Sequence, residues 1–255
     1  MATYDIFGNI TLVKFPRDMK LNEKKRYADS FLKEHKSVLT VLEKSDRLKG
    51  RLRTPGVKYI SGLRTTEALY KENGCAFRFD VSSCYFSPRL SSERAELAKK
   101  VKKGESVLVL FGGVGPFAVV IAKTGRPKKV VSVELGKIPS KYAQQNVKTN
   151  KVNVNVVQGD VRRILPKMKE TFDRVIMARP NLKDSFLDVS YPRVKKGGLL
   201  HYYGFYNEED VNELKELVYS EAHKVGRKIK IIGIKKAGNI GVREYRYRVD
   251  IKMLN

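Results

Sequence analysis

The sequence predicts an α/β protein in which a mostly parallel sheet follows a small α+β domain. Two observations lead to this prediction. From residue 76 onward, short apolar stretches alternate with amphipathic ones, as strands and helices do when helices cover both faces of a parallel sheet. A glycine-rich turn over residues 111–118 joins a buried strand to a helix, which is typical of such sheets. We expect seven strands, the last two of which form a C-terminal hairpin.

Residues 1–74 predict the small domain. Residues 4–15 alternate well enough for two short strands, residues 22–35 have apolar side chains at helical spacing, and residues 38–42 read as another strand. Residues 44–64 hold seven basic residues and one acid, interrupted by one proline and three glycines, so we expect a basic loop there. Such a loop suits phosphate contacts, although a solvated linker has the same composition.

Residues 75–255 predict the larger domain. Residues 77–86 read as strands, and residues 91–103 as a helix opened by Ser91 or Ser92. A strand, the glycine-rich turn and a helix fill residues 106–123. Further strands are expected within 130–135, 154–160, 172–180 and 197–205, with helices at 139–150, 162–168 and 207–226 and a helical crossover at 182–197. Residues 228–254 read as two strands around a Gly-Asn turn, which would add an antiparallel edge.

The net charge of the chain is strongly positive. Its 52 Lys and Arg residues outnumber 27 Asp and Glu residues, which gives a formal charge of +25. Residues 1–100 carry +9, residues 101–200 carry +13 and residues 201–255 only +3, so the excess belongs to the folded body. Lys and Arg that neutralise phosphates release counterions, and the charge therefore indicates a polyanionic partner. A lysine-rich proteome is the alternative.

Several classes of protein are excluded. Two cysteines cannot build a disulfide framework, and the three histidines lie too far apart in the sequence for a His-based zinc site. The N-terminus lacks the basic start and long apolar run of a signal peptide. The longest uncharged stretch, residues 106–122, is too short and too glycine-rich to span a bilayer. We expect a soluble, cytoplasmic protein without a metal or a membrane contact.

The glycine-rich turn predicts a ligand site. Read as Gly113-x-Gly115-x-x-Ala118, it fits a relaxed dinucleotide fingerprint, in which glycines let the backbone approach the ligand and the helix offers N–H groups. Glu134 follows at the end of the next strand, where a carboxylate accepts hydrogen bonds from ribose hydroxyls. Asp160 ends the third strand, in register to face an adenine amino group. Two acids at consecutive strand ends favour S-adenosylmethionine (SAM) over NAD, and a tight turn without a ligand is the remaining alternative.

Several stretches of the chain match one enzyme family. The most specific is Tyr-Phe-Ser-Pro-Arg-Leu-Ser-Ser-Glu-Arg at residues 85–94, and residues 111–117 and 197–203 add to it. With these stretches the chain resembles the archaeal and eukaryotic tRNA guanine-37 N1-methyltransferases over almost its whole length. The resemblance implies a Rossmann-like class I methyltransferase domain at 75–255, a tRNA-binding domain at 1–74, and SAM as the cofactor. It further implies methyl transfer to N1 of guanosine 37, next to the anticodon, by an enzyme that we expect to be a monomer.

The chemistry of that reaction explains the roles that the resemblance implies. N1 of guanine carries a proton at neutral pH, so a base must remove it, and negative charge then develops toward O6. The resemblance makes Glu93 the base and Arg53 of the basic loop the group beside O6. Without the resemblance, Glu93 would be explained by the helix dipole alone and Arg53 as one of seven basic loop residues. The cofactor site implied in this way consists of Tyr85, Arg89, Phe111, Gly113, Gly115, Glu134, Leu135, Asp160 and Val161.

Four departures from the family pattern bear on function. The chain starts without the additional domain by which longer relatives read the shape of tRNA, and we expect its basic charge to substitute. Val109 replaces the strand-end acid before the glycine loop, and the acid at position 134 is Glu where Asp is more common. The Asn-x-Pro motif, whose Asn holds the edge of the target base, is Ala178-Arg179-Pro180 here. We expect Arg179 and Pro180 to form a substrate-base loop.

The altered motif suggests a second activity. An archaeal subgroup with a change here also methylates C7 of the tricyclic wyosine precursor imG-14, giving isowyosine, and an arginine face would suit this larger base. Three other functions remain open: the wybutosine-pathway aminocarboxypropyl transferase, a non-catalytic basic RNA-binding module, and an NAD-dependent oxidoreductase. Glu93 and Arg53 disfavour the first, and the charge disfavours the last. We expect residues 201–203 to end a buried strand and to take no part in catalysis.

Overall fold

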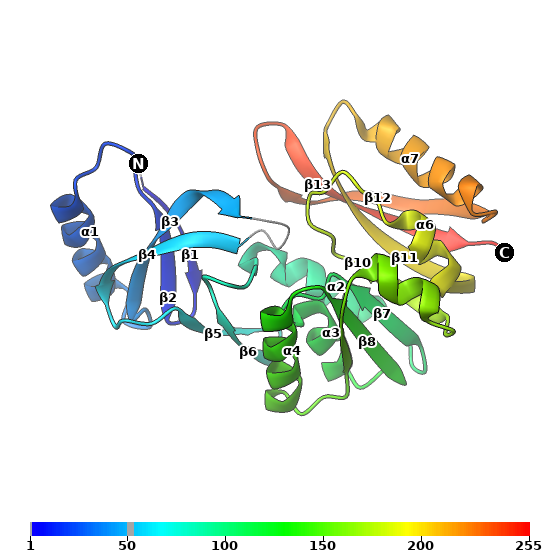
Figure 1. Cartoon of the computed structure of the whole chain (residues 1–255), viewed down its shortest axis with the longest axis horizontal. Coiled ribbons are helices and arrows are strands. Elements are labelled where there is room, and N and C mark those ends of the chain that lie inside the picture. The colour runs from blue at the N-terminus through cyan, green and yellow to red at the C-terminus, as the bar shows by residue number, and fades with distance from the viewer. Residues whose placement is uncertain (1, 50–53) are drawn as a thin grey trace.

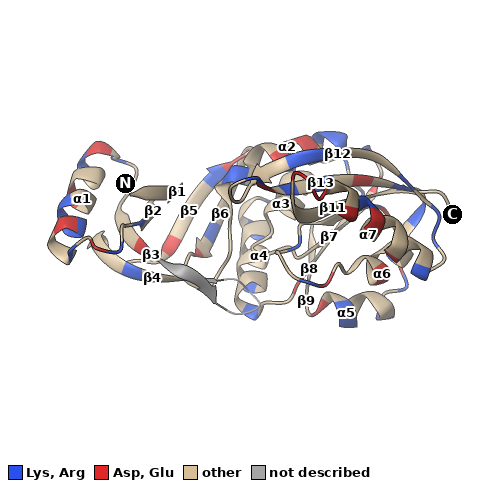
Figure 2. Ribbon diagram, turned by 90° about the horizontal axis from the view of Figure 1, so that it is seen from above, with Lys and Arg blue, Asp and Glu red and all other residues tan. Residues whose placement is uncertain are grey.

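In the described part of the chain, three β-sheets follow one another along the long axis of the molecule (Figure 1). The computed structural model describes residues 2–49 and 54–255, and for residues 45–49, 54 and 55 it describes the backbone alone. Lys and Arg occur on elements of all three sheets (Figure 2), in agreement with a charge that belongs to the folded body.

The first sheet has four strands in the order β1-β2-β3-β4. Strands β2 and β3 are parallel and α1 connects them, whereas β1 and β4 pair antiparallel with their neighbours. Phe31 of α1 packs with Val41 and Ile60 on one face of this sheet. The elements are β1 (Thr3–Phe7), β2 (Ile10–Lys14), α1 (Leu21–Glu34), β3 (Thr40–Lys49) and β4 (Thr54–Gly62).

The prediction of a loop over residues 44–64 is wrong for most of that range. Strand β3 continues to Lys49 and β4 begins at Thr54, and the two pair antiparallel, so that Lys44 lies opposite Val57. The pairing register shifts after Lys44, and such a bulge accommodates residues that interrupt the alternation of a strand. Arg53, the predicted partner of guanine O6, lies outside the described residues.

The second sheet is a hairpin of β5 (Glu67–Glu72) and β6 (Cys75–Asp80). Its turn residues, Asn73 and Gly74, both have positive φ, 48° and 70°, as the mirror-image turns of tight hairpins require. The hairpin spans the expected domain boundary at residue 74, so the division of the chain into domains stays a prediction. The strand expected over residues 77–86 ends at Asp80, after which the chain turns.

Two asparagines attach this hairpin to the larger sheet. Asn146 accepts a hydrogen bond from the backbone N–H of Arg78 (2.8 Å) and donates one to its carbonyl (3.2 Å). One helical turn later, Asn150 makes the same pair of bonds with Ala76 (2.8 and 2.7 Å). The amide groups thus act as a neighbouring strand for the edge of β6, which covers its open backbone groups.

The third sheet has seven strands in the order β12-β13-β11-β10-β7-β8-β9. Strands β7 to β11 are parallel, as the alternating pattern predicts. The elements are α2 (Ser91–Lys100), β7 (Ser106–Leu110), α3 (Pro116–Lys123), β8 (Lys129–Glu134), α4 (Lys137–Thr149), β9 (Asn155–Gln158), α5 (Val161–Ile164), β10 (Phe172–Met177), α6 (Leu187–Ser190), β11 (Val194–Asn207), α7 (Val211–Lys224), β12 (Ile229–Asn239) and β13 (Glu244–Met253).

The predicted C-terminal hairpin is confirmed, because β12 and β13 form one edge of the sheet and β13 pairs antiparallel with both β11 and β12. One detail differs from the prediction. The crossover expected at 182–197 is helical only over residues 187–193, as α6 and a 3-10 turn (Tyr191–Arg193), and its last four residues belong to β11. The sheet is otherwise as predicted.

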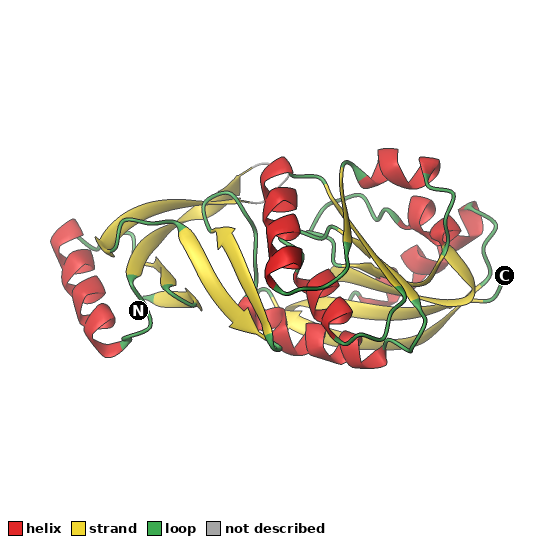
Figure 3. Cartoon of the chain, turned by 90° about the horizontal axis from the view of Figure 1, so that it is seen from below, coloured by secondary structure: helices red, strands yellow, loops and turns green. Residues whose placement is uncertain are grey.

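Helices cover both faces of the seven-stranded sheet (Figure 3). Strand β7 shows why: Val107 and Val109 belong to the core under α2, α3 and α4, whereas Leu108 and Leu110 belong to the core under α5, α6 and α7. A strand buried on both faces needs such a continuous apolar run. Among residues 2–49 and 54–255, no helix has both the length and the apolarity needed to cross a membrane.

Candidate active site

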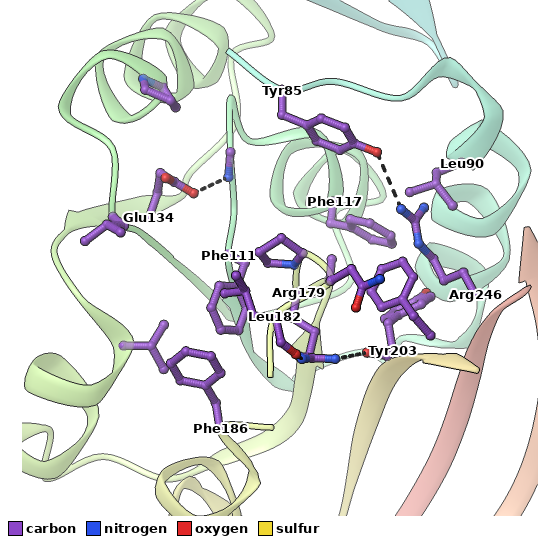
Figure 4. Close-up of a pocket in the computed structure, with 18 of the residues that line it drawn as sticks. Tyr85, Leu90, Phe111, Phe117, Glu134, Arg179, Leu182, Phe186, Tyr203 and Arg246 are labelled. Atoms are coloured by element: carbon purple, nitrogen blue, oxygen red, sulfur yellow. Dashed lines mark hydrogen bonds between the residues drawn. The ribbon is translucent and has the colours of Figure 1, made fainter. Parts of the chain in front are cut away.

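A cavity of about 360 Å³ lies at the carboxyl ends of β7 to β10 (Figure 4). The loops that follow parallel strands meet at this edge of the sheet, and ligands of open α/β sheets bind there. Nine of the residues singled out in the sequence line it: Tyr85, Phe111, Gly113, Glu134, Leu135, Asp160, Val161, Arg179 and Pro180.

The glycine-rich turn shapes one wall of the cavity. Phe111, Gly113 and Gly115 have φ values of 60°, 56° and 88°, so the chain reverses sharply between β7 and α3. At Gly112, a Cβ atom would lie 2.1 Å from Ser132 Oγ on β8, and only glycine permits this approach. Gly115 does not line the cavity: it precedes the first residue of α3 and packs near Ala143.

Glu134 joins two loops at the cavity wall. Its carboxylate oxygens accept hydrogen bonds from the backbone N–H groups of Gly113 (2.8 Å) and Gly136 (2.7 Å). Burial raises the pKa of Glu134, and these backbone bonds oppose the rise. Because each carboxylate oxygen has two lone pairs, both oxygens keep the capacity to accept from ribose hydroxyls.

Asp160 precedes α5, and its side chain accepts a hydrogen bond from the backbone N–H of Arg162 at 2.9 Å. The guanidinium of Arg162 binds Asp184 (2.5 and 2.6 Å) and Asp188 (2.9 Å). These bonds connect α5 to the segment after β10, and they set the position of Asp160 at the cavity.

The lining fits SAM in its chemistry. Two carboxylates, the free backbone of a glycine turn and an apolar wall match ribose hydroxyls, an adenine amino group and a purine ring. The apolar wall includes Phe111, whose ring lies 5.0 Å from that of Phe186. Val109, where the family pattern has an acid, is buried within β7 and does not line the cavity. The amino group of the methionine part therefore needs another partner.

Arg89 lies away from this cavity. Its side chain is 72% exposed and pairs with Asp5 of β1 at 2.8 Å. It lines a second cavity of about 270 Å³, which shares Tyr85 and Arg246 with the first. The Arg246 guanidinium reaches Tyr85 Oη at 3.5 Å (Figure 4), so these two side chains stand between the cavities. This placement gives no support to a role for Arg89 in binding SAM.

Arg179 lines the cavity, but most of its hydrogen bonds go to backbone carbonyls of its own loop. Its Nη2 donates to the carbonyls of Leu182 and of Asp184 (2.8 Å), and its Nη1 to that of Tyr203 (3.5 Å). Its guanidinium also lies over the ring of Tyr202, 5.6 Å from the centroid. Arg179 thus braces the segment around Pro180, and its role toward a substrate base stays a prediction.

Glu93 is buried in the first turn of α2 and is not among the cavity-lining residues. Its Oε1 accepts hydrogen bonds from Tyr203 Oη (2.8 Å) and from Arg248 Nη1, and its Oε2 lies 3.0 Å from Lys235 Nζ. Tyr203 does line the cavity. The predicted base is therefore one hydrogen bond behind the cavity wall.

Sequence reasoning missed three residues here: Tyr203, Arg246 and Arg248. Tyr203 was expected at the end of a buried strand; it is buried, but β11 continues to Asn207, and the Tyr203 hydroxyl donates to Glu93. Arg246 and Arg248 lie two positions apart on β13, and this spacing puts both side chains on one face of the strand. The spacing is visible in the sequence and was the available sign that the two arginines lie together.

Three comparisons with known proteins indicate the same family. A family model described as the TRM5/TYW2 methyltransferase domain matches residues 68–232. The tRNA (guanine(37)-N(1))-methyltransferase Trm5b of Pyrococcus abyssi is 34% identical over 99% of this chain and 75% of its own length. A crystal structure of Trm5b from this organism superposes with a TM-score of 0.89 and 33% identity, over 99% of this chain and 75% of that chain.

Two further relatives extend the comparison. The tRNA (guanine(37)-N(1))/4-demethylwyosine(37)-methyltransferase Taw22 of Nanoarchaeum equitans is 31% identical over 99% of this chain and 100% of its own length. TYW2 of M. jannaschii, solved in complex with AdoMet, is 25% identical, with a TM-score of 0.77 over 99% of both chains. The chain belongs to the TRM5/TYW2 methyltransferase family.

Proposed function

We propose that the protein transfers the methyl group of SAM to N1 of guanosine 37 in tRNA. One observation carries the proposal: Glu93, a carboxylate suited to accept the N1 proton, is hydrogen-bonded to Tyr203 on the wall of a cavity that fits SAM. The relatives named tRNA (guanine(37)-N(1))-methyltransferase support it.

In this reaction the chain holds SAM, limits where the target base can lie and accepts the N1 proton. When bound, SAM supplies a methyl group on a positively charged sulfur. Glu134 and Asp160 hold the adenosine part at the strand ends, and the loop around Pro180 limits where the target base can lie. The N1 proton passes to Glu93 through the Tyr203 hydroxyl, which gives its own proton to the carboxylate as it accepts one from the base.

Arg53 completes the proposal as the cation beside O6. It belongs to the part of the chain outside the described residues, so this role rests on the resemblance to the family alone. Arg53→Ala is expected to lower the rate of methyl transfer about a hundredfold, as the removal of one oxyanion-stabilising donor does, and to leave SAM binding unchanged.

The charge of the chain supports tRNA as the partner. Of the formal charge of +25, residues 1–200 carry +22, which provides phosphate contacts on the small domain and on the catalytic domain. The affinity for tRNA should therefore fall steeply as salt is raised, and a flat response would contradict phosphate-dominated binding. The proposal includes that the enzyme is cytoplasmic and works as a monomer.

A second activity is supported by one observation. Ala178, at the position of the family's Asn, lines the cavity, and its methyl group leaves space where an amide would hold the edge of guanine. We therefore add C7 of the tricyclic wyosine precursor as a second target. Aminocarboxypropyl transfer to that base is the alternative, and the mass of the nucleoside product distinguishes it from methylation.

The test is incubation of the purified protein with labelled SAM and unmodified tRNA, followed by nucleoside analysis. The wild type should form N1-methylguanosine, and Glu93→Ala should lose this activity while it still binds SAM in calorimetry. Glu170→Ala is the matched control, because this carboxylate is exposed and pairs with Lys129 far from the cavity. Absence of SAM binding by the wild type would favour a non-catalytic RNA-binding module. The same assay with tRNA that carries the tricyclic precursor tests the second activity.

A further inference from the structure

A chain of polar and charged side chains, each buried or partly buried, begins at Glu93 and leads away from the cavity. Each member contacts the next through a hydrogen bond or an ion pair, and the chain crosses from α2 to β13, β11 and β10. In order, its members are Glu93, Arg248, Asp250, His201, Arg174 and Glu105.

Arg248 is the centre of this chain. Its Nη1 donates to Glu93 Oε1, its Nη2 to Glu96 Oε1 (2.8 Å), and its Nε and Nη2 to the two oxygens of Asp250 (2.8 and 3.1 Å). The side chain is only 2% exposed. A planar guanidinium bound on three sides has one orientation, so Arg248 holds the Glu93 carboxylate in one place.

His201 determines how Asp250 is held. Arg174 Nη1 lies 2.7 Å from His201 Nε2, and because a guanidinium can only donate, Nε2 must accept. The proton of the neutral ring is then on Nδ1, which donates to Asp250 Oδ1 at 2.6 Å. Burial lowers the pKa of His201, in agreement with a neutral ring. Despite burial, the bonds from His201 and Arg248 keep the pKa of Asp250 well below its ordinary value.

Stability alone does not explain this arrangement. Ions lose hydration when they are buried, and apolar residues of the same volume often stabilise a core as well or better. A proton acceptor in a buried place has a specific need, however, which is opposite charge beside its carboxylate. Arg248 and Lys235 supply that charge to Glu93. The negative charges of Asp250 and Glu96, which bind the same Arg248 guanidinium, limit its effect.

We propose that Arg248 is a positioning residue that holds the Glu93 carboxylate directed at Tyr203, and that Asp250, oriented by His201, limits how strongly the Arg248 cation acts on that carboxylate. The inference rests on the proposed function, in which Glu93 accepts the substrate proton. Five residues face Glu93 directly or through a shared cation: Tyr203 from β11, Arg248 and Asp250 from β13, Lys235 from β12 and Glu96 from α2.

The proposal predicts opposite effects for two substitutions. Arg248→Met removes a cation that contacts the proton acceptor, and the acid limb of the single-turnover rate should move to higher pH by about one unit or more. Asp250→Asn removes an anion from the same cation, and the acid limb should move to lower pH. If the substitutions acted only through lost packing, the acid limbs of both variants would move in the same direction or stay in place.

The experiment measures single-turnover methyl transfer to tRNA between pH 5 and 9, with SAM affinity by calorimetry as a check on folding. Lys252→Met, an exposed position near the end of the same strand, is the control and should match the wild type. If Arg248→Met does not fold, Arg248→Lys keeps the charge without the three-sided contact. The single-turnover rate of Arg248→Lys should fall about tenfold, and its acid limb should stay at the pH of the wild type.

Each result decides the proposal. Opposite shifts support it, whereas folded variants with unchanged acid limbs, or shifts in the same direction, overturn it. A wild-type protein that binds SAM but forms no N1-methylguanosine would instead refute the proposed function, so the two failures are distinguishable.

Discussion

The hydroxyl of Tyr203 donates a hydrogen bond to Glu93 Oε1 over 2.8 Å, and both side chains are almost fully buried. Burial and the neighbouring carboxylate raise the pKa of Tyr203 well above its ordinary value, so the hydroxyl keeps its proton at neutral pH. It can therefore give that proton up only as it receives another, which is the behaviour of a relay.

Tyr203→Phe tests the relay. The ring and its packing remain, but the path from the cavity to Glu93 is interrupted, and the single-turnover rate should fall about tenfold or more. SAM affinity should stay within about twofold, since the hydroxyl faces Glu93 and not the strand-end acids. Tyr206→Phe, on the same strand and outside the cavity lining, is the control. A Tyr203→Phe enzyme as fast as the wild type would rule the relay out.

Glu134→Gln tests the carboxylate at the cofactor site. The new amide presents N–H to the N–H of Gly113 or Gly136, and one buried donor is left unsatisfied, at a cost of about 1–3 kcal/mol. The variant should bind SAM at least about tenfold more weakly in calorimetry and melt at a lower temperature. Glu170→Gln, an exposed glutamate, should change neither quantity. Normal SAM affinity in a folded Glu134→Gln protein would contradict the role given to this residue.

Much of the seven-stranded sheet follows from the sequence alone, and β7 shows the reason. Its five residues are all buried, so the apolar run is continuous and the turn at Gly112–Gly115 ends it clearly. The same holds for the acids at the strand ends, because chain order places Glu134 and Asp160 directly after their strands. Neighbouring residues in the sequence are enough to predict a feature that depends on those residues alone.

The remaining features depend on contacts between distant residues. Residues 44–49 carry basic side chains and read as a loop, yet pairing with β4 makes them a strand. Tyr203 and Arg248 reach Glu93 across 110 and 155 positions of the sequence, and no periodicity reports such a contact. Arg89 follows the family pattern, but an ion pair with Asp5 of the small sheet decides its place.

Asp173 should make stability depend on pH. Although burial opposes it, hydrogen bonds from Lys195 and from the backbone and hydroxyl of Ser106 hold the pKa of Asp173 at about 2. A lowered pKa in the folded state adds stability above the pKa of the unfolded chain, near 3.9, and that stability is lost as the pH falls through about 2.

Asp173→Asn should therefore melt at a lower temperature than the wild type at pH 7, and the difference should shrink between pH 4 and pH 2. Melting followed by circular dichroism at several pH values measures both quantities. Asp18→Asn, at an exposed position, is the control and should follow the wild type throughout. A gap between Asp173→Asn and the wild type that stays constant down to pH 2 would show that the hydrogen bonds of Asp173 do not depend on its charge.

Gly112 and Ser132 form a pair that a double-mutant cycle can test. A Cβ atom at position 112 would lie 2.1 Å from Ser132 Oγ but 3.5 Å from Ser132 Cβ, which is ordinary contact. The Ser132 hydroxyl is also buried without a hydrogen-bond partner among the described residues. Gly112→Ala should destabilise the protein by about 1–3 kcal/mol through overpacking, whereas Ser132→Ala should be neutral or slightly stabilising.

The double variant should regain most of the stability that Gly112→Ala loses, with a coupling of about 1–3 kcal/mol in denaturant unfolding. Because the added Cβ points at β8 rather than into the cavity, the double variant should also bind SAM with an affinity close to that of the wild type. A double variant no more stable than Gly112→Ala would mean that the constraint on Gly112 comes from backbone conformation and not from Ser132. A stable double variant that fails to bind SAM would mean that residue 112 itself faces the ligand.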